Sequence, residues 1–139
     1  MTKEQRLCLQ RFLRKHEIQS WRGYKVLYKA TTRNYDSPLY PGAVQYRPYT
    51  QVTIPAMEKD PTVTCGEGIH VGTRECALSL LQSGEADRIM RVLVRLQHIA
   101  PVSDNATAAL TKDAQRHKLR VKTLFVVDDI VRRKEGEIC

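Results

Sequence analysis

The chain has 139 residues, of which 42% are hydrophobic and 27% are charged, and its formal net charge is +8. This length suits one domain with one hydrophobic core, and the uninterrupted apolar runs are too short to cross a bilayer. We therefore expect a single domain over residues 1–139 that does not act at a membrane, with a frayed basic tail from about residue 131.

The N-terminal segment "MTKEQRLCLQRFLRKHE" is charged where a secretory signal is apolar, so we expect the protein in the cytoplasm. Its four cysteines, at positions 8, 65, 76 and 139, include no CxxC pair. In a chain without an export signal this spacing favours free thiols over a disulfide framework.

The first predicted elements are a helix and a strand. Thr2 and Gln5 have the spacing of a capping box, and apolar residues then recur every three or four positions, which predicts a helix from about Thr2 to His16. From Tyr24 to Ala30 the period changes to two, which is typical of a strand with one buried face. The segment from Arg33 to Pro61 holds five of the six prolines and predicts an elaborated loop, with at most short strands near Val44 and Val52.

The stretch "TCGEGIHVGTRECAL", residues 64–78, concentrates reactive side chains in a small space. "TVTC" and "IHV" are typical of short strands joined by a glycine turn. Thr73 is suited to cap a helix that ends at Gly84, so His70 is expected just before a helix N-terminus.

Two further alternating segments, Arg88 to Leu96 and Leu119 to Val127, predict strands separated by a polar connection. We therefore expect an α+β fold: an N-terminal helix and a twisted, mainly antiparallel sheet, with the helix after Thr73 packed on its apolar face.

Basic residues repeat at period two in three of these strands. If the strands share one antiparallel sheet, these residues collect on a single face, which then offers charge to phosphate groups. The alternative is a face that simply meets water. The candidate ligand-binding residues, on this face and beside it, are Tyr28, Lys29, His70, Thr73, Arg91, Arg95, Arg120 and Lys122, and the repeat also includes Lys25.

A metal site and a nucleophile are the other chemistries that this region suggests. Cys65, His70 and Cys76 lack the paired spacing of a zinc knuckle, so we expect no metal. Cys76 would lie in the first helical turn, where the helix dipole lowers a thiol pKa, but the apolar stripe that it begins favours a buried structural thiol. We expect no catalytic residue and no cofactor.

Two resemblances follow from these segments. "CGEGIHVGTRECAL", "RVLVRL" and "KLRVKTLFVVDDI" together resemble small, mostly uncharacterised phage and prophage proteins, which implies a mobile-element origin with no activity attached. The order of "LYKAT", "GIHVGT" and "LFVVDD" resembles the ADP-ribosyltransferase fold. That resemblance implies Lys29 and His70 at the first two nicotinamide-side positions, whereas Leu124 stands where the catalytic glutamate belongs.

The preferred hypothesis is non-enzymatic binding of a phosphate-bearing ligand, a nucleotide or nucleic acid, as a phage accessory or counter-defence factor would require. One alternative is an NAD-using transferase, and another is a factor whose basic surface docks an acidic host protein.

Overall fold

The computed structural model describes residues 2–38, 44–57, 68–101 and 118–132. The predicted strand over 62–65, the polar connection after 102 and the tail from 133 lie outside these residues. The elements in chain order are α1 (Lys3–Lys15), β1 (Ser20–Trp21), β2 (Tyr24–Thr31), β3 (Thr50–Thr53), β4 (Ile69–Gly72), α2 (Arg74–Gln82), β5 (Arg88–Val94), the 3-10 helix η1 (Leu96–His98), β6 (Lys118–Val121) and β7 (Thr123–Arg132).

The two predicted helices begin at the predicted caps. The Thr2 hydroxyl accepts from the Gln5 N–H at 3.0 Å, and the Gln5 side chain accepts from the Thr2 N–H at 3.0 Å, which completes the capping box. The Thr73 hydroxyl accepts from the Cys76 N–H at 3.1 Å at the start of α2. Gly84, with φ +85°, follows α2, as its predicted C-terminal stop requires.

A two-residue turn joins β1 to β2. Arg22 and Gly23 have φ values of +48° and +86°, the positive values that a type I′ hairpin turn needs at both central positions. The turn sets Trp21 opposite Tyr24, so the two aromatic side chains lie on the same face.

The strands form one antiparallel sheet in the order β3-β7-β5-β2-β4-β6, with β1 paired to β2. The predicted α+β fold with an antiparallel sheet is confirmed. β2 and β5 pair along seven residues, from Lys25 to Thr31, but β2 and β4 share only the pair Tyr28 and Gly72. The sheet therefore opens between β2 and β4 beyond that pair, next to Lys29.

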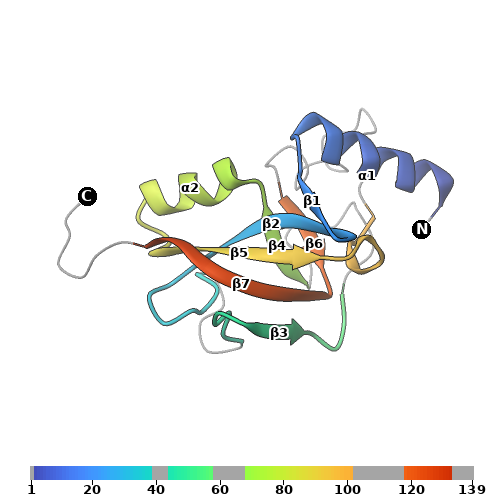
Figure 1. The fold of residues 1–139 in the computed structure, drawn as a ribbon. Coiled ribbons are helices and arrows are strands. Elements are labelled where there is room, and N and C mark those ends of the chain that lie inside the picture. The colour runs from blue at the N-terminus through green and yellow to red at the C-terminus, as the bar shows by residue number, and fades with distance from the viewer. Residues whose placement is uncertain (1, 39–43, 58–67, 102–117, 133–139) are drawn as a thin grey trace.

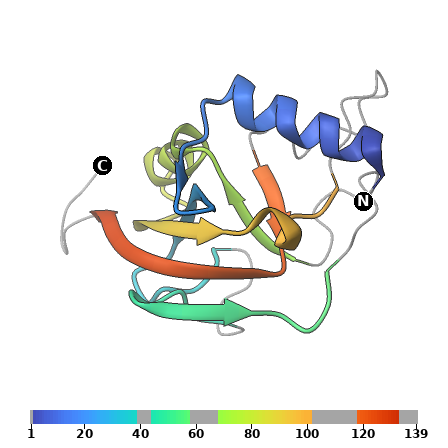
Figure 2. The same ribbon diagram turned by 45° about the vertical axis from the view of Figure 1, so that its right-hand side comes forward.

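The prediction of one continuous strand from Leu119 to Val127 is wrong. Lys122 separates β6 from β7, its N–H donates to the His98 carbonyl, and its own carbonyl accepts from the Ile54 N–H. Strands joined by one residue but far apart in the sheet order require a strongly curled sheet. Figure 2 shows β6 rising steeply from the start of β7. The predicted strand from Arg88 likewise ends at Val94, and Leu96 belongs to η1.

The curl gives the sheet an inner face and an outer face. The inner face holds the main core, to which α1 contributes Cys8, Leu9, Phe12 and Leu13. By strand alternation Ala30 and Ile89 point outward, where α2 packs on them through Ala77. In Figure 1, α2 lies beside β5 and the C-terminal end of β7, and α1 lies at the β6 end. Neither described helix is long and apolar enough to span a membrane.

A pair of neighbouring substitutions on β2 tests this assignment of faces. Leu27 is 0% exposed on the inner face, so Leu27→Ala is expected to lower the free energy of unfolding by about 2–5 kcal/mol. Val26, the preceding residue, lies half-buried on the outer face, so Val26→Ala is expected to lower the free energy of unfolding by less than half of this amount. Equal losses in denaturant titrations would contradict the assignment.

Candidate anion-binding site

The six basic residues of the period-two repeat do not share one exposed face. Lys29 lies opposite Met90 on the inner face and is 5% exposed, whereas Arg91 lies opposite Tyr28 on the outer face. Lys25, opposite Val94, also points to the inner side. The prediction of a common basic face is therefore wrong, because the register of β2 against β5 sets their basic residues on opposite faces.

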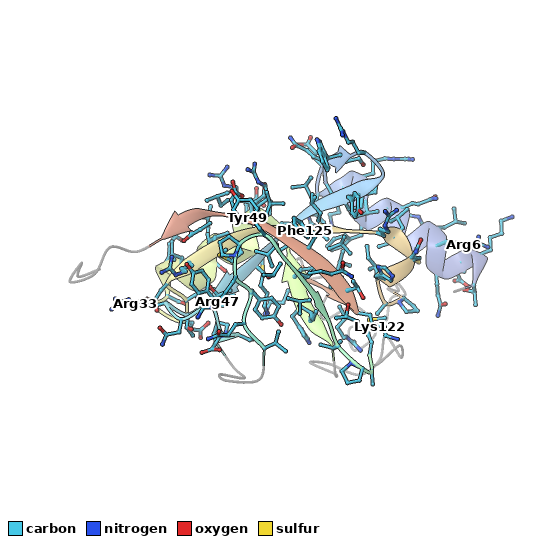
Figure 3. All side chains as sticks on the ribbon, turned by 60° about the horizontal axis from the view of Figure 1, so that its bottom comes forward. Arg6, Arg33, Arg47, Tyr49, Lys122 and Phe125 are labelled. Atoms are coloured by element: carbon cyan, nitrogen blue, oxygen red, sulfur yellow. The ribbon has the colours of Figure 1, made fainter. Side chains whose placement is uncertain are left out.

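Other predicted residues are held by local partners or lie elsewhere. Arg91 donates to both carboxylate oxygens of Asp128, at 3.0 and 2.6 Å, so the protein already balances its charge. Arg95 donates to the Tyr24 hydroxyl at 2.8 Å. Lys122 is exposed at the corner between β6 and β7, as Figure 3 shows. These three residues do not belong to one site.

Several of the remaining candidates meet around β4. Tyr28 is opposite Gly72, Gly72 is opposite Lys118, and His70 is opposite Arg120. Thr73 follows directly at the N-terminus of α2. Arg120 is only 6% exposed, and Gly68, with φ +152°, leaves room for its stem: a Cβ at Gly68 would lie 3.1 Å from the Arg120 Cγ.

Lys118 is a site residue that the sequence interpretation missed. It precedes Arg120 by two positions and so extends the same alternation, which runs Lys118, Arg120, Lys122 in the sequence. The predicted strand began one residue later, at Leu119, and this boundary excluded it. Lys118 is half-buried at the start of β6.

Lys29 is the most unusual charged group of the site. Its Nζ donates to the Ser37 hydroxyl at 3.5 Å and lies 5.2 Å from the centre of the Tyr46 ring. Among the described residues no carboxylate pairs with it. Burial and, to a lesser extent, the charge of Lys118 together lower the pKa of Lys29 to about 8. Burial raises the pKa of Tyr46 to about 12, so at neutral pH this phenol supplies no counter-charge.

Lys118 and Cys76 lie close enough to Lys29 to act on its pKa, and both lysines act on the pKa of the Cys76 thiol. Burial raises the pKa of the Cys76 thiol, and the two lysines oppose this effect without overcoming it. The thiol is therefore neutral at neutral pH, which supports the structural interpretation of Cys76 over a nucleophile. Cys65 lies outside the described residues, so the predicted absence of a metal at these cysteines stays a prediction.

We call this cluster the anion site and define it as Lys29, Lys118, Cys76 and the Thr73 cap. Cys76 lies in the first turn of α2, near the positive end of the helix dipole, and Lys29 and Lys118 both lie close enough to the Cys76 thiol to influence its pKa. Such an arrangement attracts and orients a negatively charged group. Neither a protein-family model, nor a curated protein, nor a solved structure matches this chain.

Replacement of Lys29 with methionine tests whether its charge is uncompensated. The Lys29 pKa is about 8 in the folded chain and 10.5 in the unfolded chain, so the charged form destabilises the fold below pH 8. We expect Lys29→Met to raise the free energy of unfolding by about 3 kcal/mol at pH 7. Between pH 8 and 10.5 the unfolded chain holds a proton that the folded chain has released, so wild-type stability rises with pH relative to the variant.

Denaturant titrations at pH 7 and pH 10 measure this difference, and the advantage of Lys29→Met is expected to fall below about 1 kcal/mol at pH 10. Lys122→Met, at an exposed corner, is the matched control and is expected to change stability by less than about 0.5 kcal/mol. A Lys29→Met variant that is less stable than wild type at both pH values would mean that the ammonium is compensated.

Proposed function

We propose that this protein binds a phosphate-bearing ligand of nucleotide size at the anion site. The observation that carries the proposal is the buried Lys29 ammonium, which has no carboxylate partner among the described residues. An uncompensated buried charge costs several kcal/mol, and a phosphate would supply the missing counter-charge.

The groups around the site take different parts in this binding. Lys118 and Cys76 are half-buried, so part of each side chain is accessible to a ligand, while Lys29 is buried. The Cys76 amide in the first turn of α2 already donates to the Thr73 hydroxyl, and the positive end of the α2 dipole favours a negatively charged ligand nearby. Tyr28 and His70 are half-buried on neighbouring strands and are suited to contact a base or a ribose.

An NAD-using transferase is the enzymatic alternative, and the placement of two residues favours testing it. Lys29 on β2 and His70 on β4 belong to the two strands that part beyond Tyr28. However, Leu124, which stands at the glutamate position, is 2% exposed within the core. A buried leucine offers no carboxylate to stabilise the positive charge that develops in the transfer reaction, so binding without turnover is the favoured proposal.

The third hypothesis, docking of an acidic protein, differs from nucleotide binding in its dependence on salt. Many weak surface contacts are lost together as salt rises, whereas one phosphate in a partly buried site is screened less. The net charge of +8 suits either kind of partner, so the net charge does not favour one over the other.

Calorimetric titration with inorganic phosphate, nucleoside mono-, di- and triphosphates and NAD tests the proposal. Lys29→Met is expected to weaken binding of the best of these ligands about tenfold at pH 7, the loss typical of one charge-assisted contact. Because binding needs the protonated amine, wild-type affinity is expected to fall as pH rises through about 8. Lys118→Met is expected to weaken binding as well.

Lys122→Met is the matched control and should bind like the wild type. Affinity that is unchanged both by Lys29→Met and by raising the pH to 9.5 would reject the anion site. Consumption of NAD that Lys29→Met abolishes would replace the binding proposal with the transferase.

A further inference from the structure

The part of the outer sheet face that α2 does not cover carries apolar side chains and lies away from the anion site. Inner-face residues such as Val92, Leu124 and Val126 are 0–2% exposed. Their outward-pointing neighbours Leu93 and Phe125 are half-buried, and α2 does not pack on either of them. Among the described residues, the outer face of the sheet across β2, β5, β7 and β3 is therefore only partly covered.

The strand register orders the side chains of this open face. One cross-strand row holds Val26, Leu93, Phe125 and Gln51. Trp21 and Tyr24 lie opposite each other on β1 and β2, and Arg95 contacts Tyr24. Tyr49, which precedes β3, donates its N–H to the Val126 carbonyl, and Figure 3 shows it beside Phe125. We call this surface the aromatic face and define it by Trp21, Arg22, Tyr24, Tyr49, Leu93, Arg95 and Phe125.

The two arginines of the aromatic face rest on aromatic rings. The Arg95 guanidinium lies 4.4 Å from the centre of the Tyr24 ring, and that of Arg22 lies 5.1 Å from the centre of the Trp21 ring. Among the described residues no carboxylate pairs with either guanidinium, whereas Asp128 pairs with Arg91 and Asp129 pairs with Arg88. The aromatic face thus offers positive charge that no carboxylate of the described ranges balances.

We propose that the aromatic face binds single-stranded nucleic acid. Trp21 is 51% exposed and Tyr49 is 76% exposed, and such rings stack on unpaired bases regardless of sequence. Arg22 and Arg95, which lie close to aromatic rings, have further N–H groups that can donate to phosphates. The span from β2 to β7 is about 10 Å, since neighbouring strands lie about 4.8 Å apart, which leaves room for two or three nucleotides.

A duplex suits the aromatic face less well than a single strand. The bases of a duplex are stacked on each other and are unavailable to the rings, and a broad sheet face does not enter a groove as a helix or a two-stranded ribbon does. A strong preference for single strands therefore separates this proposal from general attraction of polyanions to a chain of net charge +8.

Trp21 is the only tryptophan of the chain, so its fluorescence reports directly on the proposed surface. Titration with 12-nucleotide oligo-dT and oligo-U is expected to quench this fluorescence, with weaker binding at higher salt. Tyr49→Ala is expected to weaken binding at least about fivefold, the loss typical of one stacked base, while Tyr49→Phe keeps the ring and should bind nearly like wild type. Arg95→Ala should weaken binding, and Arg6→Ala, exposed on α1, is the matched control.

Three outcomes would overturn the proposal: no quenching, equal affinity for a 12-bp DNA duplex, or equal binding by Tyr49→Ala and Tyr49→Phe. Poly-glutamate that competes fully with the oligonucleotide would assign the face to an acidic protein instead and would also overturn it. Lys29→Met, which removes the anion site, should leave oligonucleotide binding within about twofold of wild type. The proposal for the aromatic face and the proposal for the anion site can therefore be rejected independently of each other.

Discussion

The burial of the Lys29 ammonium is the constraint on which the account of this protein depends. Lys29 is 5% exposed, and its near partners are a serine hydroxyl and a tyrosine ring. Burial of a charged amine in such surroundings lowers the stability of the fold. The geometry of the sheet explains where this cost arises. β2 pairs with β5 along its whole length but touches β4 at one residue pair, and Lys29 lies next to the opening that results. The charge of Lys118 and the first turn of α2 act on the same place, so the positive potential is concentrated there.

The curl of the sheet distributes the remaining basic residues. Two register shifts between β5 and β7 bend the strands, and the corner at Lys122 joins the edge strand β6 to β7, the strand next to the opposite edge. The inner face becomes the core, and the outer face is divided between α2 and the aromatic face. A nucleotide-sized ligand at the anion site and a nucleic-acid strand on the aromatic face would thus contact different residues. The Arg91–Asp128 ion pair joins β5 and β7 on the outer face and belongs to neither site.

Local features of the fold were predictable from the sequence, and long-range features were not. The capping box at Thr2, the cap at Thr73 and the alternation in β2 all depend on neighbours in the chain, and each was predicted. The face on which a basic residue points depends on strand register, which no local pattern states. For this reason Lys29 and Arg91 were predicted on one face but lie on opposite faces. The corner at Lys122 was missed because alternation continues through it, and Lys118 was missed because strand ends are set by pairing partners.

Direct titration of the Lys29 amine tests the central claim most closely. With isotope-labelled lysine, the NMR shifts of the side-chain carbon next to Nζ follow protonation, and Lys29→Met identifies the resonance. We expect a pKa of about 8 in the free protein and a rise toward the ordinary value of 10.5 when inorganic phosphate or a nucleotide is added. A Lys29 amine that titrates near 10.5 in the free protein and does not respond to phosphate would contradict the central claim.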